Sequence, residues 1–209
     1  MMTSEIIQLE KSQIDKASKI LAAAFNQDTL FQYVLPQERK DKLLYGLWKT
    51  ILRYSQPQNS VYTTPELKGI AVWIPPGEFP LNPLRFLLAG FYKILFQIGL
   101  KRIRRLTIFS LLEEFHKQDM SVPHWYLLGL GVSPDYQGQG IGGSLIQPIL
   151  KQADEQGLPC YLETDTHGAV RFYQRHGFEI LRTGEEPVQF WTMKREPRIS
   201  NNEHHNDKD

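Results

Sequence analysis

Apolar and polar positions repeat along the chain with two periods, which predict the order of its helices and strands. Residues 4–10 alternate weakly with the two-residue period of a strand, whereas 12–25 and 37–55 have the three-to-four-residue spacing of amphipathic helices. The segments 60–64 and 68–74 are rich in β-branched and aromatic residues and flank a proline-containing turn, which is typical of paired strands.

The rest of the chain predicts further helices and strands in alternation. Two strongly apolar helical segments cover about 83–99 and 101–119. After them the pattern predicts a strand before a glycine-rich turn, a helix over 140–157, a strand over 158–166, a short helix ended by Gly177, and a hairpin over 179–185 and 188–195. This order indicates an α/β protein.

Length and composition favour one globular domain. The chain has 209 residues, of which 41% are hydrophobic and 22% charged, so it has enough apolar residues to bury a core. No repeat or linker divides it. We therefore expect a single domain over 1–196, with 83–119 as a helical insertion, followed by a disordered polar tail over 197–209.

Charge and cysteine content narrow the classes of function. The 24 basic and 23 acidic residues nearly balance, which gives no general attraction to nucleic acid or to an anionic membrane. The single cysteine, Cys160, lies within a predicted strand, so no internal disulfide forms and a reducing, cytoplasmic location is expected. The first residues do not have the pattern of an export signal. No set of residues has metal-ligand spacing, and no metal is expected.

The predicted helices over 83–119 are unusually basic. Between Phe79 and Leu112 there are six basic residues and no acidic ones, and basic amphipathic helices can lie on membranes. Two of the basic residues, Arg85 and Lys93, interrupt the first apolar run, which argues against a spanning helix. The favoured expectation is that the apolar face packs over the sheet, through Phe86, Leu87, Phe91 and Leu95. The cluster of Arg102, Arg104 and Arg105 is then expected in solvent or at the rim of a ligand pocket, and membrane contact is the alternative.

The glycine-rich turn at 137–144 predicts a phosphate site. Gly138, Gly140, Gly142 and Gly143 allow a run of backbone N–H groups to face one anion, and the helix that follows points its positive dipole end at the same place. The spacing also matches the dinucleotide fingerprint G-x-G-x-x-G. Five residues separate the turn from its strand, however, and too little chain follows for a nucleotide domain, so this reading is disfavoured. A turn that binds no ligand stays open.

Two motifs in order carry a family resemblance. Gln137-Gly138-Gln139-Gly140-Ile141-Gly142 matches the pattern Gln/Arg-x-x-Gly-x-Gly/Ala, and Tyr173-Gln-Arg-His-Gly177-Phe178 follows about thirty residues later. With these residues the chain resembles the GNAT superfamily of acyl-CoA N-acyltransferases over roughly 124–195.

The resemblance is closer to the puromycin N-acetyltransferase-like branch. It rests on three short segments: Leu130-Gly-Val-Ser-Pro134, Leu162-Glu-Thr164 and Trp191-Thr-Met193. The chain departs from that branch at Ala169, where an asparagine is usual, and at His167 and Gly168, where proline and arginine are usual.

The resemblance implies a mixed, twisted sheet of about seven strands with helices on both faces and a splayed central strand pair. The pantetheine arm of acetyl-CoA, the implied co-substrate, enters between the splayed strands. Gly129 and Gly131 fit a bulge in the first of them. The alternative is that these small residues only admit a neighbouring helix.

The resemblance also implies residues that bind acetyl-CoA and act on it. The implied cofactor-binding residues are Leu130, Gly131, Val132, Gln137, Gly138, Gln139, Gly140, Ile141, Gly142, Gly143 and Ser144. The N–H groups of 130–132 would stabilise the negative charge that develops on the thioester oxygen when an amine attacks the thioester. Tyr173 would protonate the departing thiolate, which a phenol with a reference pKa of about 10 can do.

The general base is left open. Glu163 is the first candidate because a carboxylate in an apolar strand must face a partner or a polar cavity. It could equally be a structural carboxylate paired with an arginine. His124 is second, and a water relay with no required base is third.

The implied reaction is acetyl transfer to a primary amine of a small molecule or peptide, by direct attack in a ternary complex. A non-catalytic CoA-binding or acyl-CoA-sensing module is the alternative. The sequence does not distinguish a monomer from a homodimer.

Overall fold

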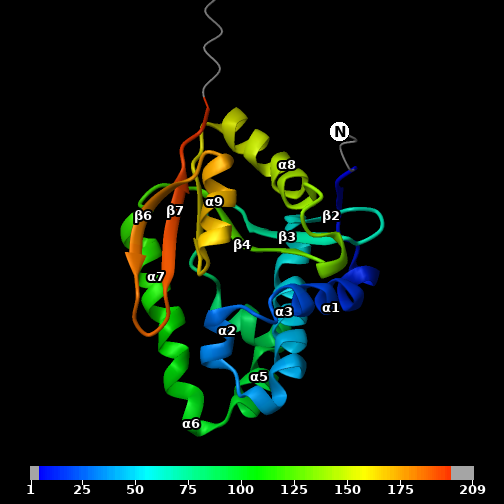
Figure 1. Ribbon diagram of the computed structural model, residues 1–209, viewed down its shortest axis with the longest axis vertical. Helices are drawn as coiled ribbons and strands as arrows, with labels where there is room; N and C mark the ends of the chain where they lie inside the picture. The colour runs from blue at the N-terminus through cyan, green and yellow to red at the C-terminus, as the bar shows by residue number, and fades with distance from the viewer. Residues whose placement is uncertain (1–4, 199–209) are drawn as a thin grey trace, which may run out of the picture.

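The computed structural model describes residues 5–198, which form one seven-stranded sheet flanked by helices (Figure 1). The strand order is β1-β2-β3-β4-β5-β7-β6. The strands are β1 (Ile7–Gln8), β2 (Val61–Thr63), β3 (Gly69–Ile74), β4 (Trp125–Val132), β5 (Cys160–Thr164), β6 (Glu179–Gly184) and β7 (Phe190–Arg195). Neighbouring strands are antiparallel except β4 and β5, which are parallel. The mixed sheet expected from the sequence is confirmed.

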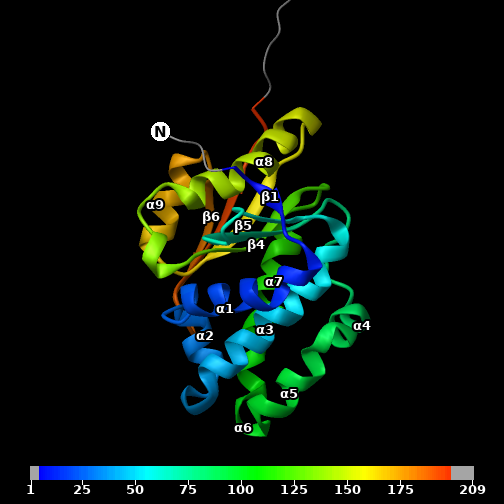
Figure 2. The ribbon, with the colours of Figure 1, turned by 90° about the vertical axis from the view of Figure 1, so that its right-hand side faces the viewer.

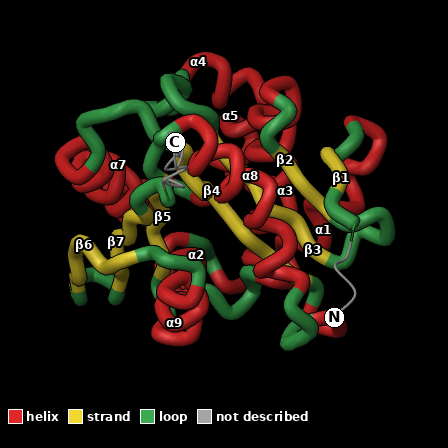
Figure 3. Tube along the Cα trace, turned by 90° about the horizontal axis from the view of Figure 1, so that it is seen from above, coloured by secondary structure: helices red, strands yellow, loops and turns green. Residues whose placement is uncertain are grey.

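Helices cover both faces of the sheet. On one face lie α1 (Ile14–Ala24), α2 (Thr29–Val34) and α3 (Lys40–Ser55), and on the other α8 (Ile141–Gln156) and α9 (His167–Arg175) (Figures 1 and 3). Each face has its own apolar core. Side chains from β3 and β7 reach both cores because successive residues of a strand point to opposite faces.

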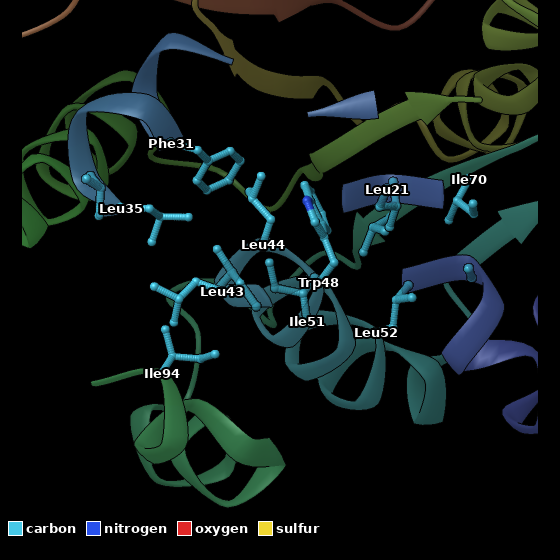
Figure 4. Packing of buried hydrophobic residues seen from close by; sticks show 14 of the residues in the cluster. Leu21, Phe31, Leu35, Leu43, Leu44, Trp48, Ile51, Leu52, Ile70 and Ile94 are labelled. Atoms are coloured by element: carbon cyan, nitrogen blue, oxygen red, sulfur yellow. The ribbon is translucent and has the colours of Figure 1, made fainter. Parts of the chain in front are cut away.

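The core on the α3 side is built around the apolar stripe of that helix (Figure 4). Leu44 and Trp48 are fully buried, and the Trp48 ring lies 4.6 Å from that of Phe25. Stripe residues recur every three or four positions, as the sequence predicts, so α3 presents one continuous apolar face to its neighbours.

The segment predicted as two long helices, 83–99 and 101–119, is divided into shorter ones. The structure has α4 (Pro83–Phe86), a π-type turn over Leu87–Phe91, α5 (Tyr92–Ile98), α6 (Leu100–Ile103) and α7 (Thr107–Asp119). The physical reason lies in Gly90 and Gly99, whose φ angles of 131° and 80° a helix does not allow. Only α7, with 13 residues, is a long helix, and it ends where the sequence predicts.

The segment from α4 to α5, which includes Phe86, Leu87, Phe91 and Leu95, does not pack over the sheet, so the expectation is wrong there. It lies along α3, on its side away from the strands (Figure 2). The ring of Phe86 lies 5.6 Å from that of Tyr54, and a Cβ placed on Gly46 would come within 2.7 Å of Ile94. Because Gly46 has no side chain, α5 can approach α3 closely at this position. For α7 the expectation is confirmed, since Phe115 packs against Phe190 of β7 and His116 against Tyr161 of β5.

Two further differences concern the ends of the chain and a short helix. The helix α2 was not predicted, because its six residues are too few to show a period. The predicted disordered tail, 197–209, lies outside the described residues except for 197 and 198.

Candidate active site

The two central strands separate after a short paired stretch. Trp125–Leu127 of β4 pair with Cys160–Leu162 of β5, and no described strand pairs with that edge of β4 beyond Leu127. On its other side β4 pairs with β3, with a register shift between Leu127 and Gly129. The predicted bulge is therefore present. Backbone groups on the open edge of β4 are left to bind something other than a strand.

Close helix packing also accounts for the two strand glycines. A Cβ on Gly129 would lie 2.5 Å from the Trp48 ring. On Gly131 it would lie 2.8 Å from Leu21 and 3.0 Å from Ala24. A neighbouring helix thus explains both glycines, whereas the bulge adjoins Gly129 alone, since Gly131 pairs regularly with Ile70.

The glycine-rich turn connects β4 to α8 and ends at Gly140, the N-cap of that helix. Gly138 and Gly140 have φ angles of 75° and 81°, and a Cβ on either would meet no atom within 4 Å. Glycine is thus required there by backbone conformation, with open space in front of the helix end. The first N–H groups of α8 have no acceptor within the helix, and its dipole is positive there.

The polar side chains of the turn bind the turn itself. Nε2 of Gln137 donates to the carbonyl of Val132 at 3.2 Å, and Nε2 of Gln139 donates to that of Asp135 at 3.4 Å. The Ser144 hydroxyl lies 3.5 Å from the carbonyl of Gly140. These residues shape the turn, and the groups left free to bind an anion are backbone N–H groups.

Tyr173 lies on the buried face of α9. Its ring packs 5.7 Å from that of Phe178 and 5.0 Å from that of Phe172, within the α8 and α9 core. Burial raises the pKa of its phenol above the ordinary value, so the hydroxyl remains protonated at neutral pH.

Glu163 lies on β5, on the sheet face that α7 covers, and its side chain is 14% exposed. Burial raises the pKa of its carboxyl to about 8, while the nearby Tyr126 hydroxyl acts in the opposite direction by favouring the ionised form. Among the described residues no arginine forms an ion pair with Glu163. Arg182 binds Asp119 of α7 instead, at 2.5 Å.

His116 of α7 joins this carboxyl, and the sequence did not identify it. Its ring is stacked between those of Phe79 and Tyr161, at 3.7 and 3.9 Å, and its Nδ1 lies 3.6 Å from Oε1 of Glu163. A sequence signal was present, because His116 continues the buried stripe of Ile108 and Leu112. A polar residue on an apolar helix stripe needs a buried partner.

His116 and His124 form a directional pair. Nδ1 of His124 lies 2.7 Å from the carbonyl of Val122, which can only accept, so this nitrogen carries the proton. The Nε2 atoms of the two histidines are 2.7 Å apart, so His116 must donate there. Burial lowers the pKa of both imidazoles. In the neutral pair, Nδ1 of His116 therefore has a lone pair directed toward Glu163.

Asp165 ties α2 to the end of β5, and Asp28 caps the helix. Oδ2 of Asp165 accepts from the backbone N–H and the hydroxyl of Thr29, at 2.7 and 2.6 Å. Asp28 caps α2 by accepting from the N–H of Phe31 at 2.9 Å, and burial together with the Asp165 charge raises the pKa of its carboxyl to about 7. The short helix is thus held beside the strand that carries Glu163.

A cavity of about 530 Å³ lies between α7 and the β6–β7 hairpin. It is lined by the apolar Leu111, Phe115 and Phe190 and by the charged Arg182, Glu185 and Glu186. Within residues 5–198 no group of three or more His, Cys, Asp or Glu side chains could hold a metal ion.

Comparison with known proteins shows what the chain resembles. The model of the acetyltransferase (GNAT) family matches residues 91–178. An uncharacterized N-acetyltransferase of Schizosaccharomyces pombe is 27% identical over 203 residues, which cover 91% of this chain and 82% of the relative. A probable serine/threonine-protein kinase of Dictyostelium discoideum is 26% identical, and the match covers 83% of this chain but only 28% of that protein.

Solved structures share the fold. A Corynebacterium glutamicum structure, described as histone acetyltransferase HPA2 and related acetyltransferase, superposes with a TM-score of 0.65 at 21% identity, covering 96% of this chain and 99% of the other. A Drosophila melanogaster polyamine N-acetyltransferase, which forms N-acetylagmatine, gives 0.62 at 16% identity, covering 92% and 99%.

Proposed function

Since the chain belongs to the GNAT superfamily and is an N-acetyltransferase, we propose that it transfers an acetyl group from acetyl-CoA to a primary amine. One observation carries the proposal: the open edge of β4 leads directly into the glycine turn and the N-terminus of α8. A long cofactor with a thioester at one end and phosphates at the other fits these features in that order.

The turn and the strand edge divide the binding of acetyl-CoA between them. Backbone N–H groups of Ile141, Gly142 and Gly143 would hold the pyrophosphate, supported by the open space at Gly138 and Gly140. The N–H groups of 130–132 would bind the pantetheine arm and stabilise negative charge on the thioester oxygen. Bound acetyl-CoA supplies the activated acetyl group.

Tyr173 would act as the acid. Its phenol is protonated at neutral pH, and proton donation to the departing sulfur prevents the reverse reaction at that atom. Its place on α9, which follows β5 directly, supports this role.

Glu163 would act as the base. The ionised carboxylate takes a proton from the acceptor's ammonium group and then releases it to solvent. The two histidines stay neutral because burial lowers the pKa of both imidazoles, and the lone pair on Nδ1 of His116 favours the protonated form of the carboxyl. The carboxylate must be ionised to start, so turnover should rise as the pH passes through about 8. The absence of an arginine partner among the described residues favours this role over a structural carboxylate.

The acceptor would be a small amine with an apolar body. The cavity beside α7 offers aromatic walls from Phe115 and Phe190 and two carboxylates, Glu185 and Glu186, that attract a cation. The polyamine N-acetyltransferase of similar fold is consistent with such a substrate. A peptide amine remains within the proposal, as does membership of the puromycin N-acetyltransferase-like branch, which the segments at 130, 162 and 191 support.

The proposal includes direct attack in a ternary complex and a cytoplasmic location. The fully buried Cys160, whose thiol pKa burial raises to about 12, suits a protein that forms no disulfide.

The test is the release of free CoA thiol from acetyl-CoA in the presence of panels of monoamines, polyamines, aminoglycosides and peptides. Release that depends on one amine class, with the acetylated amine identified by mass spectrometry, is the expected result. Tight CoA binding without release for any amine would favour the non-catalytic CoA-binding alternative.

A further inference from the structure

An apolar ridge runs along the exposed side of α4, the π-type turn over Leu87–Phe91 and α5. We define it as Leu84, Leu88, Tyr92 and Phe96, whose side chains are 65%, 75%, 43% and 86% exposed. They recur every fourth residue, whereas Ile94 and Ile98 of the same segment are buried against the α3 core. The segment is therefore apolar on two faces, and only one of them is covered within the described chain.

The ridge belongs to a wider concentration of exposed apolar side chains. Twelve large hydrophobic residues are exposed in the described chain, and eight of them lie between residues 84 and 111. The other four of these eight are Leu87, Ile103, Phe109 and Leu111. Single exposed apolar residues are ordinary, and Leu111 lines the cavity beside α7, but the four ridge residues together mark a surface that is covered when the protein functions.

The same segment carries uncompensated positive charge. Of its basic residues, Arg85 forms an ion pair with Glu78. The guanidinium groups of Arg102 and Arg105 donate to the carbonyls of Leu35 and Tyr33, contacts that leave their charge intact. Lys93 and Arg104 are exposed and have no carboxylate partner among the described residues.

We propose that the apolar ridge docks this enzyme on an anionic lipid surface. No helix within residues 5–198 is long and apolar enough to cross a membrane, so the contact is peripheral. Leu88 and Phe96 insert among the acyl chains, Tyr92 lies at the headgroup level, and Lys93 and Arg104 contact lipid phosphates.

Charge favours an anionic lipid surface over a second copy of the chain as the partner that covers the ridge. A two-fold dimer through the ridge would bring together two identical basic segments, in each of which Lys93 and Arg104 have no carboxylate partner among the described residues. An anionic membrane instead supplies both an apolar layer and the opposite charge. Electrostatic attraction brings the protein to the surface, and the ridge then keeps it there.

The test is co-sedimentation with vesicles of phosphatidylcholine alone and of equal parts phosphatidylcholine and phosphatidylglycerol. The wild-type protein is expected to bind the anionic vesicles and to remain partly bound at physiological salt. Phe96→Ser is expected to weaken binding about tenfold or more, since it removes one inserted aromatic side chain. Leu181→Ser is the matched control, because Leu181 is also exposed, at 42%, but lies on β6.

Three results would overturn the proposal. They are no binding by the wild-type protein, equal binding by the wild-type and Phe96→Ser proteins, and a concentration-dependent dimer in sedimentation velocity that Phe96→Ser dissociates. Circular dichroism checks that the variants are folded. Independently of their stability, a fluorophore on Phe96→Cys should shift to the blue on anionic vesicles while one on Leu181→Cys does not. Cys160 is fully buried and does not compete for the label.

Discussion

At the residue scale, burial moves the proton equilibria of Glu163 and Tyr173 in the same direction, toward the protonated form. The consequences for chemistry are opposite. A phenol that holds its proton is ready to act as an acid, whereas a carboxyl that holds its proton must lose it before it acts as a base.

Replacing Tyr173 with phenylalanine tests the acid role. Tyr173→Phe keeps the ring that packs against Phe178 and removes only the hydroxyl. We expect turnover to fall by about 10²- to 10⁴-fold while CoA affinity measured by calorimetry is unchanged. Unchanged turnover, with the chemical step shown to be rate-limiting, would exclude Tyr173 from the mechanism.

Replacing Glu163 with glutamine tests its buried position through stability. The pKa of this carboxyl is about 8 in the folded protein and near the ordinary value in the unfolded chain. The folded state therefore binds the proton more tightly, so the wild type loses stability as the pH rises between these two values. Each unit of pKa difference corresponds to about 1.4 kcal/mol.

Glu163→Gln cannot ionise and should lose less stability over this interval. Urea unfolding of both proteins at about pH 5 and pH 9 measures the difference. Asp28, whose pKa is also raised, contributes equally to both proteins and cancels. Parallel pH dependence of the two proteins would mean that Glu163 is solvated in the folded state.

At the element scale, the two ends of α8 differ, because only the N-terminus is positioned to bind the phosphates of CoA. The helix is bounded by two glycines of similar conformation, Gly140 with φ of 81° and Gly157 with φ of 65°. They provide a matched pair for separating backbone strain from ligand binding.

Gly140→Val is expected to reduce CoA affinity at least about tenfold, because a Cβ there strains the backbone and enters the space before the helix end. Gly157→Val introduces the same kind of strain at the other end and should leave CoA affinity unchanged. Calorimetry on both folded variants decides. Equal affinities would place the phosphates elsewhere.

Elements differ in how far the sequence predicts them. The β4 strand and the α8 helix are long enough to show a clear period, and glycines mark the turn between them. The structure confirms all three. The short helix α2 depends on Asp165 accepting from Thr29, a contact across 136 residues that no local pattern records. His116 likewise meets Glu163 only because α7 folds back onto β5.

At the scale of the whole molecule, the family resemblance predicts the sheet and its splayed strands, and these are confirmed. It does not predict the helices between β3 and β4. Two glycines break that segment, and the small residue Gly46 on α3 draws α5 away from the sheet. The roles assigned to Tyr173, Glu163 and the turn residues stay predictions. The positions of these residues are consistent with those roles.

The short paired stretch between β4 and β5 has a mechanical consequence. Three residue pairs join the two halves of the sheet, and the Trp125 indole N–H, which donates to Gln156 at 2.8 Å, fastens that end of β4 to α8. Rotation about this joint displaces the distant Val132 end more than the Trp125 end, as in a hinge. Small flexing of the sheet therefore changes the width available to a pantetheine chain, and departure of the spent CoA is expected to depend on the stiffness of this joint.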